Sequence, residues 1–174
     1  MHTLITLMAL GTVAVDIAIV ALVIALFIPK YRASVLSTVR TYGLLSILIL
    51  SSASVAGTLL MQYAGALAPC LLCWWQRVFM YPVAIIAIIA LIKNTRLSLI
   101  ADYILALSVM GAAVALYQHL LQILPAGSLI PCDAAGDCAV RSVFEFGFVT
   151  IPWMALSVFV LLAIIAFITR TESN

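Results

Sequence analysis

The sequence predicts an all-α integral membrane protein with five transmembrane helices. Three observations support this prediction: the composition, the length of the apolar segments and the placement of the basic residues. Of the 174 residues, 67% are hydrophobic and only 8% are charged, and the mean hydropathy is +1.31. A water-soluble domain carries far more charge, about 25% of its residues. The composition therefore excludes a soluble globular protein and allows at most one domain, which lies in membrane lipid.

Five apolar segments are long enough to cross a bilayer core about 30 Å thick, which takes roughly 20 helical residues. They are Leu4–Ile28, Tyr42–Tyr63, Cys73–Ile92, Leu97–Leu121 and Ile151–Thr169. We expect connections at Pro29–Thr41, Ala64–Cys70, Lys93–Arg96 and Gln122–Thr150. Strands are not expected, because a lipid-facing strand alternates apolar and polar residues, whereas these segments are apolar on all sides.

The first segment is predicted to be a retained helix and not a cleaved signal peptide. It has no basic residues before its apolar stretch, carries Asp16 near its middle, and is followed by Pro29 and Lys30 where a signal peptide has small residues. An acid inside a spanning segment usually faces a partner or a cavity. Asp16 therefore either has a functional role or, as we favour, lies near the outer interface and hydrogen-bonds to a neighbouring helix.

The basic residues predict the orientation of the chain. With five helices, six of the eight basic residues fall on one side of the membrane: Lys30, Arg32, Arg40, Lys93, Arg96 and Arg170. Only Arg77 and Arg141 fall on the other side. The positive-inside rule then places the N-terminus outside and the C-terminus in the cytoplasm. All four cysteines face the outer side, where disulfides form and persist.

Cys70 and Cys73 form a C-x-x-C pair at the start of the third segment. This spacing is typical of cysteines that cycle between dithiol and disulfide. Pro69 is expected to place Cys70 at the helix N-terminus, where unpaired N–H groups and the helix dipole favour a thiolate. Arg77 follows Cys73 by one helical turn, so its charge is expected to stabilise a thiolate or a reduced anionic ligand. An inert disulfide or ordinary buried thiols remain the structural alternative.

Cys132 and Cys138 lie in the longest connection, separated by five residues that include Gly136 and two aspartates, a turn-rich composition. A disulfide here would be open to attack by a thiolate of another protein. The pair could instead be a structural staple. A staple needs no second dithiol nearby, whereas a relay does, and the two pairs on one face therefore favour a relay. A zinc site built from both pairs is disfavoured in an oxidising compartment, so no metal ligand is predicted.

His119 lies near the outer end of the fourth segment, at roughly the depth of Cys73. A neutral imidazole there can hydrogen-bond a ligand carbonyl or relay a proton. It can equally be an ordinary interfacial residue.

Several stretches resemble the DsbB/BdbC family of bacterial thiol oxidases. They are residues 69–77 (PCLLCWWQR), 117–119 (YQH), 135–139 (AGDCA) and 146–153 (FGFVTIPW). The resemblance runs over about residues 42–170, and it implies a four-helix transmembrane domain there. Residues 1–41 are then an extra N-terminal transmembrane helix with a cytoplasmic connection, and residues 171–174 are a cytoplasmic tail.

The resemblance implies a membrane thiol:quinone oxidoreductase that generates disulfides. A reduced, soluble, DsbA-like periplasmic oxidant with a thioredoxin fold would attack the Cys132–Cys138 disulfide, with Cys132 forming the mixed disulfide. Cys138 would then exchange with Cys70. The reaction in which a thiol attacks a disulfide proceeds through such mixed-disulfide intermediates.

The resemblance also implies the final acceptor and the location. Cys73 would pass electrons to ubiquinone or menaquinone held near Arg77, with His119 assisting. The protein would be a multi-pass protein of the bacterial inner membrane, and its partners would be lipid and the soluble oxidant, with no nucleic acid.

The chain departs from the four-helix DsbB pattern in its extra first segment and in the short spacing between Cys132 and Cys138. This spacing resembles compact BdbC-like and DsbI-like relatives. Three alternatives stay open: an oxidase like vitamin K epoxide reductase, where the loop pair precedes the C-x-x-C pair; a non-enzymatic membrane protein with structural disulfides or a metal site; and a reductant that carries electrons outward. Only relative redox potentials decide the direction of electron flow.

Overall fold

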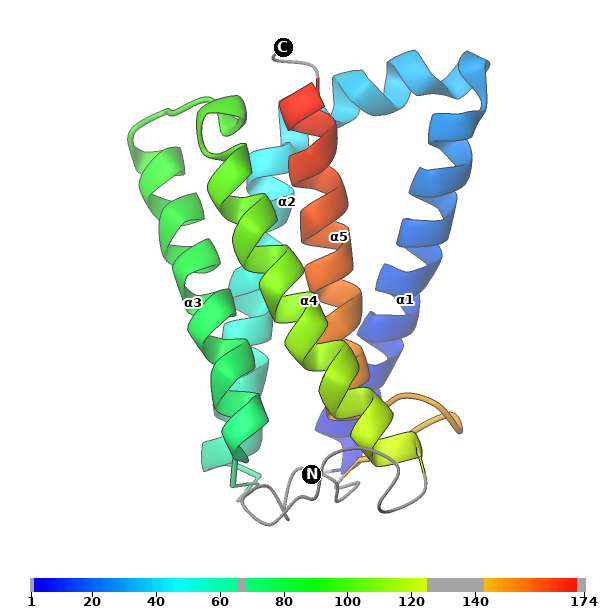
Figure 1. The fold of residues 1–174 in the computed structure, drawn as a ribbon, viewed down its shortest axis with the longest axis vertical. Coiled ribbons are helices and arrows are strands. Elements are labelled where there is room, and N and C mark those ends of the chain that lie inside the picture. Colours follow the sequence, from blue (N-terminus) through cyan, green and yellow to red (C-terminus); the bar gives the residue numbers. More distant parts are fainter. Residues whose placement is uncertain (1, 66–67, 125–142, 172–174) are drawn as a thin grey trace.

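The computed structural model describes residues 2–65, 68–124 and 143–171 (Figure 1). Within these ranges the chain forms five long helices and one 3-10 turn: α1 His2–Phe27, α2 Pro29–Tyr63, α3 Leu71–Ile92, η1 Leu97–Leu99, α4 Ala101–Ile123 and α5 Ile151–Thr171. All five helices are long and apolar enough to cross a membrane. The predicted all-α, five-helix membrane fold is confirmed.

Pro29–Thr41, expected to be the connection between the first two spanning segments, is helical. These residues form the beginning of α2, which is 35 residues long. Figure 1 shows this part of α2 crossing one end of the bundle before the helix enters it. Pro29 stands at the first turn of the helix, where its missing N–H is tolerated, and no glycine or proline follows before Gly43. The exposed charges of Lys30 and Arg32 end the apolar segment, but they do not end the helix.

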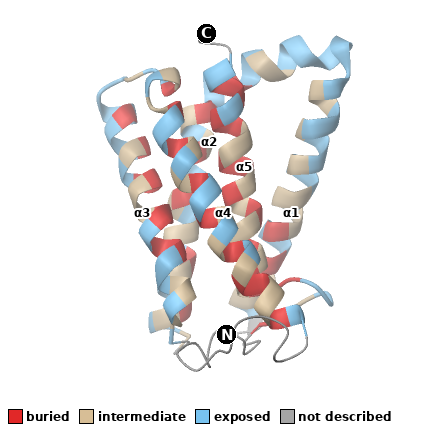
Figure 2. Ribbon diagram, viewed as in Figure 1, coloured by how far each residue is buried: buried red, intermediate tan, exposed pale blue. Residues whose placement is uncertain are grey.

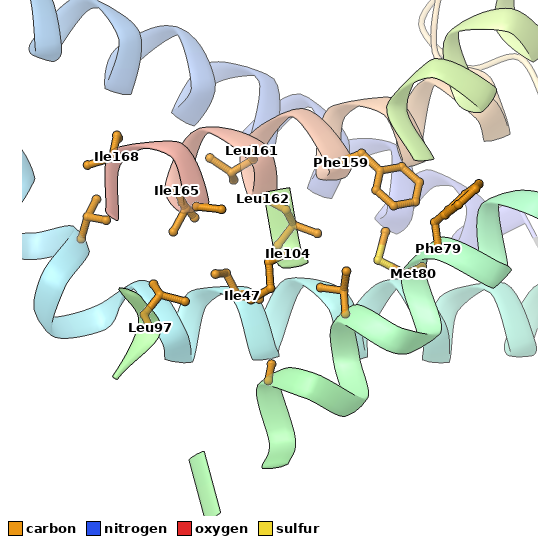
Figure 3. Packing of buried hydrophobic residues seen from close by; sticks show 14 of the residues in the cluster. Ile47, Phe79, Met80, Leu97, Ile104, Phe159, Leu161, Leu162, Ile165 and Ile168 are labelled. Carbon is orange, nitrogen blue, oxygen red and sulfur yellow. The ribbon is translucent and has the colours of Figure 1, made fainter. Parts of the chain in front are cut away.

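Helices α2 to α5 pack around one apolar core (Figure 3). Ile47, Ile104, Phe159 and Leu162 are fully buried at its centre. A Cβ atom on Gly111 of α4 would overlap the ring of Phe159, so glycine is what allows α4 and α5 to approach closely here. Large apolar side chains on the outer faces remain exposed, as expected for helices surrounded by lipid (Figure 2).

Helix α1 lies at the edge of the bundle and meets α5 near the end where the N-terminus lies (Figure 1). Its Ala9 is fully buried in a small second apolar cluster with Val149 and Met154. The indole Nε1–H of Trp153 on α5 donates a hydrogen bond of 3.1 Å to the Oδ2 atom of Asp16. The expectation that Asp16 hydrogen-bonds to a neighbouring helix is therefore confirmed.

Candidate functional site

The C-x-x-C pair lies where α3 begins. Cys70 is the N-cap residue of α3, as predicted, and its carbonyl oxygen accepts a hydrogen bond from the backbone N–H of Trp74. Cys73 lies in the first turn of the same helix. The two Sγ atoms are 3.1 Å apart. This is longer than the S–S bond of about 2.05 Å, so the pair is a dithiol whose sulfurs need to move only slightly to form a disulfide.

Gln118 of α4 holds this dithiol from across the bundle. Its Nε2 atom lies 3.3 Å from the Sγ atom of Cys70 and 3.4 Å from that of Cys73. The Oε1 atom of Gln118 accepts a 2.6 Å hydrogen bond from Nε2 of Gln76. Because the amide oxygen is occupied by Gln76, the amide N–H groups of Gln118 are directed at the two sulfurs.

Gln118 and Gln76 lie within the stretches that carry the family resemblance, residues 117–119 and 69–77, but the sequence assigned neither of them a role in the site. Both side chains are almost completely buried, with 2% and 7% of their surface exposed. A buried amide in an apolar helix is costly unless it is hydrogen-bonded, so it usually has a specific partner. That signal could have identified both residues.

Arg77 is buried, and its guanidinium points towards α2. It donates hydrogen bonds to the Oε1 atom of Gln62 and, at 3.3 Å, to the backbone oxygen of Thr58. Its Cζ atom also lies 5.0 Å from the ring centre of Trp74, a cation–π contact. No described carboxylate forms an ion pair with Arg77. The sequence predicted that its charge would act on Cys73, but the hydrogen bonds found for it lead to α2.

An apolar cavity of about 350 Å³ lies beside Arg77 and Gln76. Its walls come from α1, α2, α3 and α5. Most of the described lining is aliphatic or methionine side chains, and Arg77 is the one cationic residue among the described lining residues. The cavity therefore suits a largely apolar molecule that presents an oxygen to a fixed positive charge.

His119 is a buried residue near the end of α4, and it lies against the start of α5. It is not among the described lining residues of this cavity. Its Nδ1 atom lies 3.0 Å from the hydroxyl oxygen of Thr150, and its ring centre lies 5.0 Å from that of Trp153. The same hydroxyl oxygen accepts a hydrogen bond from the backbone N–H of Trp153 and so caps α5. His119 is thus tied to the first turn of α5.

Cys132 and Cys138 lie outside the described residues, so the second predicted pair is known from the sequence alone. The geometry defines a helical membrane protein with a dithiol at the start of one spanning helix. The next turn of that helix carries Gln76 and Arg77, which line an apolar cavity; Cys70 and Cys73 are not among its described lining residues. Sulfurs at this separation can form and break a disulfide, which is the chemistry of a thiol oxidoreductase.

Comparison with known proteins agrees with this class. The family model described as "Disulfide bond formation protein DsbB" matches residues 39–169. Disulfide bond formation protein C of Bacillus subtilis (strain 168) is 33% identical over 123 residues, which are 70% of this chain and 87% of the relative. Probable disulfide formation protein C 1 of Bacillus cereus (strain ATCC 10987 / NRS 248) is 36% identical over 130 residues, 74% of this chain and 92% of the relative.

A relative from a different genus, the probable disulfide formation protein of Metapseudomonas resinovorans, is 37% identical over 110 residues, 62% of this chain and 74% of the relative. No solved structure matches the chain. The chain belongs to the DsbB family. It is a multi-pass membrane protein of disulfide bond formation, and hence an oxidoreductase. Helix α1 precedes the matched residues.

Proposed function

We propose that this protein is a quinone-dependent protein-dithiol oxidase. It reoxidises a soluble, DsbA-like oxidant with a thioredoxin fold and passes the electrons to a membrane quinone. One observation carries the proposal: the dithiol of Cys70 and Cys73 is held by Gln118 at the same end of α3 as an apolar cavity with Arg77 in its wall.

The cavity suits a quinone in size and chemistry. Its volume of about 350 Å³ falls within the range of roughly 300–1,000 Å³ that small-molecule sites occupy. Its apolar walls suit the ring and the isoprenoid tail. Arg77 and Gln76 have N–H groups that can donate hydrogen bonds to the carbonyl oxygens of a quinone. A bound ubiquinone or menaquinone would supply an acceptor for two electrons and two protons.

The residues of this chain would prepare the dithiol for oxidation. When Cys70 and Cys73 form a disulfide, the pair gives up two electrons and two protons. The amide of Gln118 donates towards both sulfurs and so stabilises negative charge on either one as it attacks or leaves. The fixed charge of Arg77 would stabilise negative charge on an oxygen in the cavity. The contacts of His119 with Thr150 and Trp153 support an assisting role in holding the first turn of α5.

Electrons would enter through Cys132 and Cys138. A thiolate of the soluble partner attacks their disulfide at Cys132, and the second partner thiol completes the partner's own disulfide. Cys132 and Cys138 are then both thiols. Cys138 next attacks a Cys70–Cys73 disulfide at Cys70, which forms a Cys138–Cys70 mixed disulfide and releases Cys73 as a thiolate. Cys132 then attacks Cys138 in this mixed disulfide, which restores the loop disulfide and releases Cys70, so Cys70 and Cys73 are left as the dithiol. Each exchange conserves one disulfide and moves two electrons.

The distribution of charge supports an inner-membrane location with both cysteine pairs outside. The start of α2, the connection from α3 to α4 and the C-terminus lie at one end of the bundle, and the start of α3 lies at the other (Figure 1). Lys30, Arg32, Lys93 and Arg96 are exposed at the first of these ends, which the positive-inside rule assigns to the cytoplasm. We assign residues 42–170 as the catalytic four-helix domain and residues 1–41 as an addition to it.

Catalytic turnover tests the proposal. Wild-type protein in nanodiscs is mixed with short-chain ubiquinone and an excess of reduced thioredoxin-fold oxidant, and both quinone absorbance and partner thiols are followed. We expect one quinone to be reduced for each partner disulfide formed. Cys73→Ser should abolish turnover, whereas Ala56→Ser, which adds a hydroxyl group at an exposed position of α2, should not. Normal turnover by Cys73→Ser, or none by the wild type, would refute the proposal.

A further inference from the structure

Helix α1 lies outside the residues matched by the family model, yet it lines the cavity next to Arg77. We propose that α1 forms part of the quinone-binding site and that Asp16 is the positioning residue that holds α1 against α5. The inference rests on the proposed function, because it concerns the same cavity. It assigns a role to the segment that distinguishes this chain from a four-helix protein.

One face of α1 supplies the wall. Met8, Gly11, Thr12 and Val15 all line the cavity. They are spaced three, four and seven residues apart, which places them on one side of a helix. A Cβ atom on Gly11 would meet nothing within 4 Å, so open space lies in front of this residue. Gly11 and Ala53 of α2 are the exposed members of the lining, which places the mouth of the cavity between α1 and α2.

Two contacts keep this face of α1 in place. On the α2 side, the side chain of Met8 packs over Gly57, where a Cβ atom would lie 2.7 Å from the Cε atom of Met8. On the α5 side, Asp16 accepts the hydrogen bond from Nε1 of Trp153. Asp16 lies one turn beyond Thr12, which is buried in the cavity wall. The helix is thus fixed on both flanks of the cavity.

The contact with Trp153 matters because Trp153 belongs to the turn of α5 that also lines the cavity. Ile151, Met154 and Ala155, around it in the sequence, are lining residues. The indole ring of Trp153 also contacts His119. An acid within an apolar span is costly unless it has a polar partner, so its presence in α1 indicates a contact that the fold requires. The Asp16–Trp153 hydrogen bond joins α1 to α5, two of the four helices that line the cavity.

The first test fills the cavity from the α1 side. Gly11→Leu places a side chain in the open space, whereas Ala21→Leu adds similar bulk at an exposed position of α1 that does not line the cavity. We expect Gly11→Leu to raise the KM for short-chain ubiquinone at least tenfold, with the KM for the soluble oxidant unchanged. The rise in Tm that this quinone causes, which reports binding without catalysis, should also be lost. Ala21→Leu should behave like the wild type.

The second test removes the hydrogen bond that holds α1 against α5. Asp16→Leu removes the hydrogen-bond acceptor, and Asp16→Asn retains an oxygen that Trp153 can reach. We expect a three- to tenfold rise in the quinone KM for Asp16→Leu and near wild-type values for Asp16→Asn. A purely structural role would lower the Tm or the kcat without this selective change in the quinone KM, and that result would overturn the role of Asp16.

The two readouts separate this inference from the proposed function. Wild-type protein that binds the quinone without turning over refutes the proposed function, and the comparison of binding between Gly11→Leu and Ala21→Leu still decides the role of α1. A folded Gly11→Leu variant with unchanged quinone binding and KM overturns the inference, while the oxidase activity stands. Absence of both binding and turnover in the wild type overturns both.

Discussion

The side-chain amide nitrogen of Gln118 lies 3.4 Å from the Sγ atom of Cys73, a residue 45 positions earlier in the chain. It lies at nearly the same distance from Cys70, so one amide bridges both sulfurs of the pair. The environment of the dithiol is therefore set by the packing of α4 against α3 as well as by its place at a helix N-terminus. Gln76 fixes the direction of the bridge by donating to the amide oxygen of Gln118.

Replacing Gln118 is expected to slow the chemistry of the dithiol. Gln118→Leu removes the donor that stabilises charge on the sulfurs, and hydrogen bonds to charged groups contribute about 1.5–3 kcal/mol. We therefore expect at least a tenfold lower rate of alkylation of the reduced Cys70–Cys73 pair by iodoacetamide at fixed pH. Ser108→Ala is the matched control, because Ser108 is a buried polar residue of the same helix whose hydroxyl has no hydrogen-bond partner among the described residues. Equal rates for Gln118→Leu and the wild type would contradict the role of the bridge.

Arg77 is expected to control affinity for the acceptor. Arg77→Gln removes a buried positive charge from the cavity wall, so we expect the KM for short-chain ubiquinone to rise about tenfold or more. Such a rise corresponds to about 1.4 kcal/mol. Arg77→Lys keeps the charge but not the two-pronged geometry and should have an intermediate effect. The control Arg96→Gln removes an exposed charge at the other end of the bundle. A quinone KM that is the same for Arg77→Gln and Arg96→Gln would argue against a ligand-binding role for Arg77.

The sequence predicts much of this fold because lipid-spanning helices must be long and apolar. The helix ends other than the start of α2 lie within four residues of their predicted positions. The helical structure of Pro29–Thr41 was not predicted because hydropathy detects where a segment leaves the apolar core, whereas helix formation depends on backbone hydrogen bonds and continues through charged residues. The position of Cys70 at the start of α3 follows from local signals, since Pro69 immediately precedes it.

The contacts within the site could not be predicted in the same way. The spacing between Cys73 and Arg77 indicates a shared helix face, but the partners of Arg77, Gln62 and Thr58, come from another helix. Such contacts depend on the rotation and depth of each helix, which a single apolar sequence does not encode visibly. Likewise, Gln118 and His119 are neighbours on α4, and only the packed bundle directs the former to the sulfurs and the latter to Thr150.

Packing between α4 and α5 is expected to be sensitive at Gly111. Gly111→Ala would force a methyl group against the ring of Phe159, which is fully buried. Overpacking of this kind costs about 1–3 kcal/mol, which lowers the Tm of a chain of this size by roughly 2–12 °C. Phe159→Leu should relieve part of the loss in the double variant. Gly11→Ala serves as the control, because its methyl group meets open space and the Tm should not fall. A Gly111→Ala protein as stable as the wild type would contradict this packing.

Thr150 is expected to stabilise the start of α5 through two contacts of one hydroxyl group. Thr150→Val keeps the shape of the side chain but removes the cap on the backbone of Trp153 and the hydrogen bond with His119. Loss of an N-cap costs about 0.5–2 kcal/mol, so thermal unfolding in detergent should show a lower Tm. Thr150→Ser retains the hydroxyl and should remain close to the wild type. A Thr150→Val protein with the same Tm as the wild type would contradict the stabilising role of the hydroxyl.

We propose that Cys70 and Cys73 are the pair that delivers electrons to the quinone. A single-turnover experiment on the Cys132→Ser/Cys138→Ser double variant, reduced beforehand and mixed with short-chain ubiquinone without oxygen, tests it most directly. We expect one quinone to be reduced per protein molecule while the Cys70–Cys73 disulfide forms, as seen by the loss of two titratable thiols. Quinone that stays oxidised in this variant, or quinone reduction that persists after Cys73→Ser is added, would contradict the claim.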